Sequence, residues 1–253
     1  MKKLSVIIIT CNEADNIKAC LESVKWADEI VVVDSFSDDD TVKICRLYTD
    51  KIYQNRFEGY ASQKNFALDK STGEWVLSID ADEIVSPRLK SEITAAAGRV
   101  EAVFNGYCFP RKNYLGDRWI KHCGLYPDNV LRLFRRTKGR FGERLVHESV
   151  TVTGSIGKIR EPLEHYTFRS TDDMAGRMKY YAGLAARQMI KDGRKSGWYN
   201  LLFNPVFTFL KLYLVRLGFL DGRAGLVICF FYSYYTFLKY KKMLNQALDK
   251  VSL

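Results

Sequence analysis

The chain has 253 residues, of which 47% are hydrophobic and 13% aromatic, and its formal net charge is +10. This composition excludes a disordered protein and suits one large domain, or a domain with an appendage. The positive charge favours an anionic partner, which could be a nucleic acid, a phosphorylated small molecule or a membrane surface.

Buried strands and helices are expected to alternate over the first hundred residues. Strands are predicted at 5–9, 30–33, 51–54 and 75–79, and helices after Asn12, near 41, at 60–68 and after Pro87. The continuous β-branched runs are typical of strands covered on both faces, and Asn12 is expected to cap the first helix. The alternation predicts an α/β fold, with a mainly parallel sheet and helices on both faces.

Beyond residue 100 the pattern becomes irregular. Strands are expected at 107–111, 130–134 and 146–152, a helix at 171–192, and very apolar, aromatic helices at 198–220 and 224–238. We therefore expect one domain over residues 1–195, with two halves (1–110 and 111–195), followed by a helical region over 196–253.

Three of the predicted strands end in polar clusters: Thr-Cys-Asn-Glu at 10–13, Asp-Ser at 34–35, and Asp-Ala-Asp at 80–82. A parallel sheet would bring them to one edge, where ligands bind. Two carboxylates there suit Mg²⁺ or Mn²⁺, which can bridge a diphosphate and stabilise a departing nucleoside diphosphate. Singly, each cluster is equally well explained as a helix cap or a turn.

Together and in this order, the clusters resemble the family 2 inverting glycosyltransferases, which have the GT-A fold. The residues that carry the resemblance are Asn12, Glu13, Asp34, Asp80 and Asp82. Residues 34–41 resemble the family's Asp-x-Ser-x-Asp-x-Thr region. Residues 63–65 lie where the family often has Ala-Arg-Asn, and Lys64 keeps the charge of that arginine but not its planar fork. The resemblance covers residues 4–110.

The resemblance implies a nucleotide-sugar transferase with a UDP-sugar donor, a divalent metal and inversion. The implied donor-binding residues are Thr10, Asn12, Glu13, Asp34, Lys64, Asp80 and Ala81. The metal would be held by Asp82 and Asp80, with His165 as a further ligand, as a late histidine serves in some GT-A enzymes.

An inverting transfer needs a general base. Glu148 is our first candidate, although it is equally well explained as a surface carboxylate paired with Arg144; Asp128 and Glu143 are alternatives. We expect His122 to be structural or to lie on the acceptor side.

A looser resemblance, carried by residues 128–135, 141–148, 163–165 and 218–222, points to bacterial lipopolysaccharide-core glucosyltransferases. It implies glucose transfer to a lipid-linked saccharide acceptor. The apolar, basic C-terminal helices would then lie in an anionic inner-membrane interface. A buried hairpin or a homo-oligomer interface is the alternative.

The sequence also bears on compartment. Six scattered cysteines form no C-x-x-C pair and resemble no disulfide framework. The first apolar run is too short for a signal-peptide core. We expect a protein at the cytoplasmic face of the inner membrane.

Three other functions fit this sequence less well. A nucleotidyltransferase would need a glycine-rich basic loop after the first strand, and this chain lacks one. A nucleic-acid-binding protein is disfavoured by acidic strand ends, so no nucleic-acid partner is expected. A non-catalytic, membrane-bound scaffold that binds nucleotide sugar is disfavoured by the presence of both Asp80 and Asp82.

Overall fold

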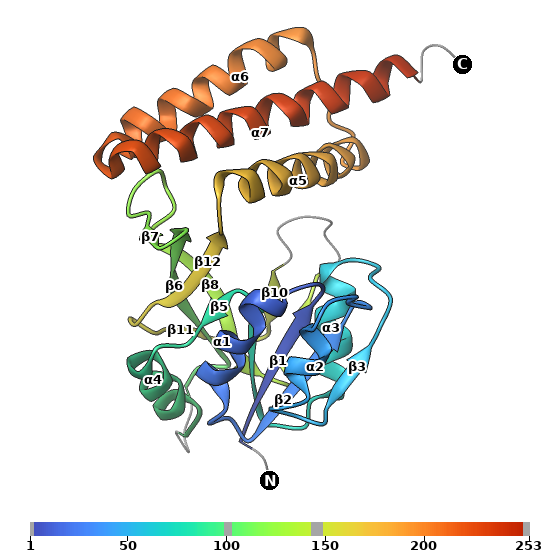
Figure 1. Cartoon of the computed structure of the whole chain (residues 1–253), viewed down its shortest axis with the longest axis vertical. Helices are drawn as coiled ribbons and strands as arrows, with labels where there is room; N and C mark the ends of the chain where they lie inside the picture. Colours follow the sequence, from blue (N-terminus) through green and yellow to red (C-terminus); the bar gives the residue numbers. More distant parts are fainter. Residues whose placement is uncertain (1–2, 99–102, 143–148, 250–253) are drawn as a thin grey trace. The chain divides into compact units, whose positions relative to one another are not determined.

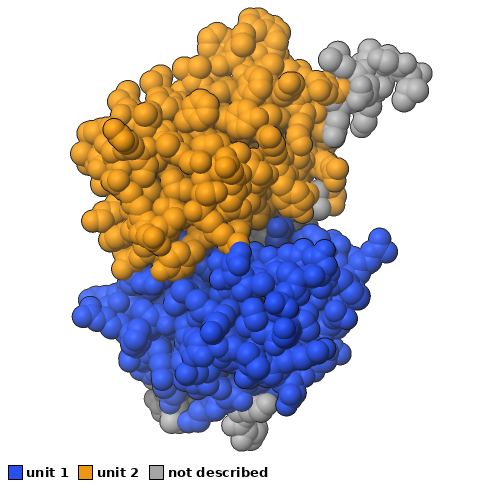
Figure 2. Space-filling view, in the orientation of Figure 1, with its two compact units in different colours: residues 1–111, 128–143, 147–165 blue, residues 112–127, 144–146, 166–253 orange. Residues whose placement is uncertain are grey.

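The computed structural model describes residues 3–98, 103–142 and 149–249. The chain forms two compact units (Figure 2). Unit 1 is built from the described parts of residues 1–111, 128–142 and 149–165, and unit 2 from those of 112–127 and 166–249.

Most of the expected strands and helices are present at close to their predicted positions (Figure 1). The strand expected at 146–152 is seen as Val150–Val152, with residues 146–148 outside the described part of the chain, and the helix expected at 198–220 is interrupted after Leu210 and before Gly218. The strands are β1 (Leu4–Thr10), β2 (Glu29–Asp34), β3 (Ile52–Gln54), β4 (Trp75–Asp80), β5 (Glu83–Ile84), β6 (Gly106–Leu115), β7 (Arg118–Trp119), β8 (Asp128–Arg135), β9 (Gly139–Phe141), β10 (Val150–Val152), β11 (Ile156–Lys158) and β12 (Leu163–Phe168). The helices are α1 (Ala14–Val24), α2 (Thr41–Cys45), α3 (Tyr60–Lys70), α4 (Pro87–Gly98), α5 (Thr171–Lys191), α6 (Trp198–Leu210), the π-helix η1 (Lys211–Val215), the 3₁₀ helix η2 (Gly218–Asp221) and α7 (Gly222–Asp249).

The main sheet has the strand order β3-β2-β1-β4-β8-β6-β12-β5, with β7 and β11 also paired to β6. Strands β1 to β4 are parallel, whereas β8 runs antiparallel to both β4 and β6. The α/β prediction is confirmed. The antiparallel part was not foreseen, because strand direction depends on pairings between distant segments.

Alternating side chains of β1 fill two cores. Val6 and Ile8 pack in one cluster with α1 and α4, and Ile7 packs in the other with α3, β9 and β10. The predicted presence of helices on both faces is therefore confirmed. In α1 the residues Ile17, Cys20, Leu21 and Val24, spaced along one face, are buried.

The predicted cap of α1 is wrong. The residue before the helix is Glu13, and its side chain makes no capping hydrogen bond; the N–H of Ala14 instead donates to Asp39 Oδ2 at 3.0 Å. Asn12 instead has a φ of 54°, and its side-chain oxygen accepts a hydrogen bond of 3.0 Å from the backbone N–H of Asp38. Its own N–H donates to the Ser37 hydroxyl at 2.9 Å. Asn12 thus joins the loops after β1 and β2.

In unit 2, α7 packs against both α5 and α6 (Figure 1). Its core includes Met174 and Met178 of α5 and Ile228 and Cys229 of α7. Helix α6 contributes only Pro205 to the buried residues. Within the described part of the chain, no helix combines the length and the apolar character needed to cross a membrane.

Candidate active site

The three polar clusters lie side by side at the carboxyl edge of the parallel strands. In the strand register, Thr10 of β1 is opposite Asp34 of β2, and Ile9 is opposite Asp80 of β4. The predicted meeting of these strand ends is confirmed. It follows from the parallel pairing, which places equivalent ends at one edge.

The loops after β1 and β2 hold each other in place. The fully buried Asp34 carboxylate accepts hydrogen bonds from the Ser37 hydroxyl (2.5 Å) and the Ser37 N–H (3.0 Å). The N–H of Glu13 donates to the Thr41 hydroxyl at 2.8 Å. The Thr10 hydroxyl is buried at the same edge and has no hydrogen-bond partner among the described residues. Such an unpaired polar group is unusual and often marks a ligand site.

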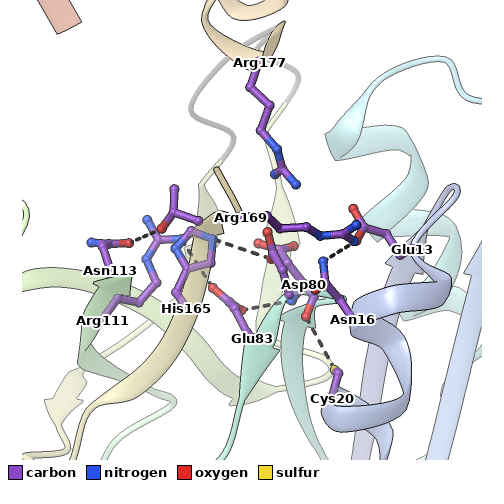
Figure 3. Close-up of polar contacts among 12 residues, drawn as sticks. Glu13, Asn16, Cys20, Asp80, Glu83, Arg111, Asn113, His165, Arg169 and Arg177 are labelled. Atoms are coloured by element: carbon purple, nitrogen blue, oxygen red, sulfur yellow. Dashed lines mark hydrogen bonds and ion pairs between the residues drawn. The ribbon is translucent and has the colours of Figure 1, made fainter. Parts of the chain in front are cut away.

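Asp80 belongs to a network of charges, and Figure 3 shows it near Glu83, which lies beside Arg111. One carboxylate oxygen of Asp80 lies 2.9 Å from the Lys64 ammonium, and the other lies 2.5 Å from Arg132 Nη2. Arg132 also meets Glu83 at 2.6 Å, and Arg111 lies 3.3 Å from the same Glu83 oxygen. The side chains of Lys64, Arg132 and Glu83 are 4%, 9% and 0% exposed, so the network holds several charges away from water.

Neighbouring charges decide the protonation states in this network. Burial raises the pKa of Asp80, but Arg132 and Lys64 outweigh it and hold that pKa well below its usual range. Burial lowers the pKa of Arg132, but Asp80 and Glu83 outweigh it and raise that pKa. Asp80 is therefore an anion and Arg132 a cation at neutral pH. This suits charge stabilisation, and it makes Asp80 a poor proton acceptor.

Asp82 and His165 are brought together by β5 and β12. His165 pairs with Glu83 in the antiparallel register, which places its Nε2 3.5 Å from Asp82 Oδ1. Asp82 is 8% exposed and Ala81 is 5% exposed. Carboxylate oxygen and imidazole nitrogen are donors that suit Mn²⁺ and, for the oxygen, Mg²⁺. Among the described residues, no three His, Cys, Asp or Glu side chains form a group that could hold a metal.

The candidate bases have different outcomes. Glu148 and Glu143 lie outside the described residues. Asp128 is held by Arg111, whose Nη2 lies 2.5 Å and whose Nε lies 2.9 Å from Asp128 Oδ2. Two guanidinium nitrogens on one carboxylate oxygen fix the position of the Asp128 side chain.

Sequence reasoning missed Glu83, Arg111 and Arg132. Glu83 directly follows the Asp-Ala-Asp cluster, Arg132 interrupts the apolar run 130–134, and Arg111 follows the mainly apolar residues 107–110. A cation within a strand that is expected to be buried signals a buried partner. The partner's identity was hidden, because Arg132 and Glu83 are 49 residues apart.

His122, expected to be structural or on the acceptor side, lies in unit 2 next to Asp221. Its Nδ1 is 3.0 Å from Asp221 Oδ1, and its N–H donates to Asp221 Oδ2 at 2.8 Å. Asp221 is 5% exposed. The pair therefore fixes the chain that follows β7.

A parallel α/β core with paired aspartates and buried cations at its carboxyl edge is the architecture of transferases that use nucleotide-activated sugars. Residues 5–167 match the family model described as glycosyl transferase family 2. The chain belongs to this family and is a glycosyltransferase; an inverting mechanism is consistent with that membership.

Known relatives cover nearly the whole chain. The lipopolysaccharide core biosynthesis glycosyltransferase LpsC of Rhizobium meliloti is 34% identical over 249 residues, which are 90% of this chain and 89% of that protein. An uncharacterized glycosyltransferase of Rickettsia prowazekii is 30% identical over 268 residues, with 98% and 89% covered. The mannosyltransferase PcManGT of Pyrobaculum calidifontis, solved with GDP-Man and Mn²⁺, shares the fold with a TM-score of 0.54 and 17% identity over 96% of this chain and 87% of that one.

Proposed function

We propose that this glycosyltransferase moves a sugar, glucose by the resemblance above, from a UDP-sugar to a lipid-linked saccharide of the lipopolysaccharide-core class, with inversion and with a divalent metal. The observation that carries the proposal is the charged network at the sheet edge. It sets Lys64 and Arg132 around Asp80, next to Asp82. Fixed cations and an acidic pair at one edge suit a diphosphate with its metal.

Donor binding is assigned to the edge formed by β1, β2 and β4. Thr10, Asn12, Glu13, Asp34 and Ala81 lie on the strand ends and loops at this edge. The unpaired hydroxyl of Thr10 supports a ligand contact there. The buried Asp34 carboxylate accepts two hydrogen bonds from Ser37. In this proposal, Asp34 therefore holds the loop that faces the nucleoside.

Asp82 and His165 would hold the metal, with Asp80 beside them. Mg²⁺ and Mn²⁺ sites of this kind use one or two protein ligands and complete the shell with phosphate oxygens and water, which fits the two donors that lie 3.5 Å apart. When bound, the ion supplies positive charge for the leaving diphosphate. Lys64 and Arg132 supply further fixed positive charge.

The chemistry that remains is proton transfer. The acceptor hydroxyl oxygen forms a bond to the anomeric carbon while the bond from that carbon to the UDP oxygen breaks, and a base takes the hydroxyl proton. Glu148 remains our first candidate for the base, with Glu143 and Asp128 as alternatives. Of the three, Asp128 lies among the described residues, where Arg111 Nη2 is 2.5 Å from Asp128 Oδ2.

The proposed acceptor is supported by the relative LpsC, a glycosyltransferase of lipopolysaccharide core biosynthesis. The division of the chain belongs to this proposal: residues 1–110 bind the donor, 111–195 bind the acceptor, and 196–253 associate with the membrane.

The donor site is tested by calorimetric titration with UDP, with and without Mn²⁺, and with GDP as a second nucleotide. We expect UDP binding that depends on Mn²⁺ and that Asp82→Asn weakens by about tenfold or more. Asp69→Asn is the control, since Asp69 is exposed and paired with Arg140. Preference for GDP would refute the uridine donor, and no binding of either nucleotide would refute the site.

Association with an anionic membrane surface is proposed from unit 2. Of the twenty large hydrophobic side chains that are exposed among the described residues, fourteen lie between 198 and 230. On α6, Trp198 is 68%, Phe203 65% and Phe207 67% exposed. The basic residues Arg194, Lys195, Lys211, Arg216 and Arg223 are exposed nearby in the sequence. Aromatic and aliphatic groups beside cations are typical of helices that lie in an anionic interface.

The free thiols support a location at the cytoplasmic face of the inner membrane, because all six cysteines are unbridged. The test is sedimentation with vesicles that contain anionic lipid. We expect binding that falls with salt and that Phe203→Ser with Phe207→Ser reduces strongly. The control is Leu47→Ser, because Leu47 is 78% exposed in unit 1. If the double variant instead dissociates a dimer and leaves vesicle binding unchanged, the face is a homo-oligomer interface.

A further inference from the structure

Unit 2 contains a cluster of cations and aromatic rings that plays no part in the donor site. We call it the Trp119 cluster: Lys112, Trp119, Lys121, His122 and Tyr126. Lys112 lies on β6, Trp119 on β7 and the other three on the chain that follows β7. All five lie within residues 112–127, which form one segment of unit 2.

Two ammonium groups share one indole ring. Lys112 Nζ lies 4.9 Å and Lys121 Nζ 5.0 Å from the centroid of the Trp119 ring. Within the described chain neither lysine forms an ion pair with a carboxylate. Two like charges held near one ring repel each other, and an anion between them would remove that cost. The arrangement therefore favours a negatively charged ligand.

The rings are held in place. Trp119 pairs with Tyr114 in the β6–β7 ladder, and the Tyr126 ring meets the indole edge-on, with centroids 5.2 Å apart and an interplanar angle of 86°. The indole N–H is buried and has no hydrogen-bond partner among the described residues. A rigid, half-buried aromatic surface costs little entropy when a ligand packs on it.

Asp221 positions the basic end of the cluster. This buried carboxylate accepts hydrogen bonds from the N–H groups of Lys121 (3.3 Å) and His122 (2.8 Å) and contacts His122 Nδ1 at 3.0 Å. With Nδ1 facing Asp221, the imidazole presents Nε2 on its other side. Since the His122 side chain is 29% exposed, that nitrogen is a further polar group for a ligand.

We propose that the Trp119 cluster binds an anionic sugar, that is, a sugar ring that carries a phosphate or a carboxylate. The lysines take the charged group, and the aromatic rings take the apolar face of the sugar. The proposal rests on the transferase function above and assigns the cluster to the acceptor saccharide. A lipid surface fits less well, because none of the large hydrophobic side chains of residues 112–127 is among the exposed ones.

The test is an NMR titration of the uniformly ¹⁵N-labelled full chain, read at the indole N–H of Trp119, which Trp119→Phe assigns. The probes are mannose 6-phosphate, glucuronic acid, methyl mannoside and inorganic phosphate. We expect both anionic sugars to shift the resonance and methyl mannoside to leave it unchanged at equal concentration. Comparison of mannose 6-phosphate with glucuronic acid then shows whether the Trp119 cluster prefers a phosphate or a carboxylate.

The variants separate charge from folding. Lys112→Gln with Lys121→Gln should weaken anionic-sugar binding by about tenfold or more, because both charge-assisted contacts are lost. Lys18→Gln with Lys90→Gln is the matched control, since Lys90 lies over the ring of another tryptophan, with its Nζ 5.5 Å from that ring's centroid. The control pair should bind as the parent does, and both pairs should keep the parent melting temperature.

Several results would overturn the inference. One is equal binding by the two lysine pairs. Another is inorganic phosphate that binds as tightly as mannose 6-phosphate, since the sugar ring would then contribute nothing. A third is a cluster variant that loses vesicle binding but keeps sugar binding, which would make the cluster a lipid-headgroup site. UDP titration of the same samples reports on the donor site alone, so failure of the transferase proposal is seen separately.

Discussion

Replacing Arg132 with methionine should strongly destabilise unit 1. Arg132 is 9% exposed on its side chain, and its Nη2 reaches both Asp80 (2.5 Å) and Glu83 (2.6 Å). Methionine has a comparable apolar length but leaves Glu83 fully buried, with only Arg111 as a nearby cation. Removing one partner of a buried ion pair costs about 3–5 kcal/mol, since the other charge stays behind without compensation.

A second estimate agrees with the first. Two hydrogen bonds between charged groups are lost, each contributing about 1.5–3 kcal/mol, or about 3–6 kcal/mol together. Urea unfolding at pH 7, followed by tryptophan fluorescence, measures the loss of unfolding free energy. Arg140→Met is the control, because Arg140 and its partner Asp69 are 58% and 56% exposed and such a pair contributes about 1 kcal/mol or less.

The double variant Arg132→Met with Glu83→Gln tests the reasoning further. Neutralising Glu83 removes the buried charge that has lost one of its arginine partners, so the combined loss should be smaller than the sum of the two single losses. A loss below about 1 kcal/mol for Arg132→Met alone, comparable to the exposed control, would refute the view that the network depends on compensation between buried charges.

Three other changes have defined outcomes. The pKa of Asp80 is low in the folded state despite burial, because of its cation partners. As pH falls below about 4, the Asp80 carboxylate becomes protonated in the unfolded chain before it does in the folded protein. The stability advantage of the parent over Asp80→Asn should therefore be complete above that pH and shrink towards acid, as urea unfolding between pH 7 and 2 will show. Gly225→Ala would place a Cβ 1.9 Å from the Gly218 carbonyl oxygen and should destabilise unit 2 by about 3 kcal/mol. At Gly176 an added Cβ would meet no atom within 4 Å, so Gly176→Ala should be neutral or stabilising. Thermal melts measure both glycine variants. Ser170→Ala should remove about 1 kcal/mol of unfolding free energy, because the Ser170 hydroxyl caps α5 by accepting from the Asp173 N–H at 3.1 Å; an unchanged melting temperature would contradict this.

The sequence allowed the parallel half of the fold to be predicted, because local patterns determine it. The apolar runs of β1, β2 and β4 are buried on both faces, and a buried strand shows this directly as an unbroken hydrophobic segment. The meeting of their polar ends then follows from parallel pairing alone. Strand β8 shows the limit, since nothing local in it indicates that it runs antiparallel to β4.

The candidate site was foreseen in its acidic part and missed in its basic part. Asp80 and Asp82 stand together in the sequence, whereas Arg132 reaches Asp80 across 52 residues. Asn12 shows a different failure: its residue type suits a helix cap, but its contact with the Asp38 N–H competes successfully for the same side chain. Residue types and local sequence patterns indicated the candidate site residues, and contacts between distant residues determined which of them interact.

The change of strand direction at β4 has a consequence for how this protein could be re-engineered. β4 pairs in parallel with β1 and antiparallel with β8, and β6, the strand beyond β8, leads into residues 112–127. Residues 112–127 lie between those two strands and form one segment of unit 2. A chimera that receives this segment from a relative would exchange the Trp119 cluster while keeping Asp80, Asp82 and Lys64. Relatives could diverge by the same exchange, with residues 112–127 open to variation and the segments that carry Asp80, Asp82 and Lys64 constant.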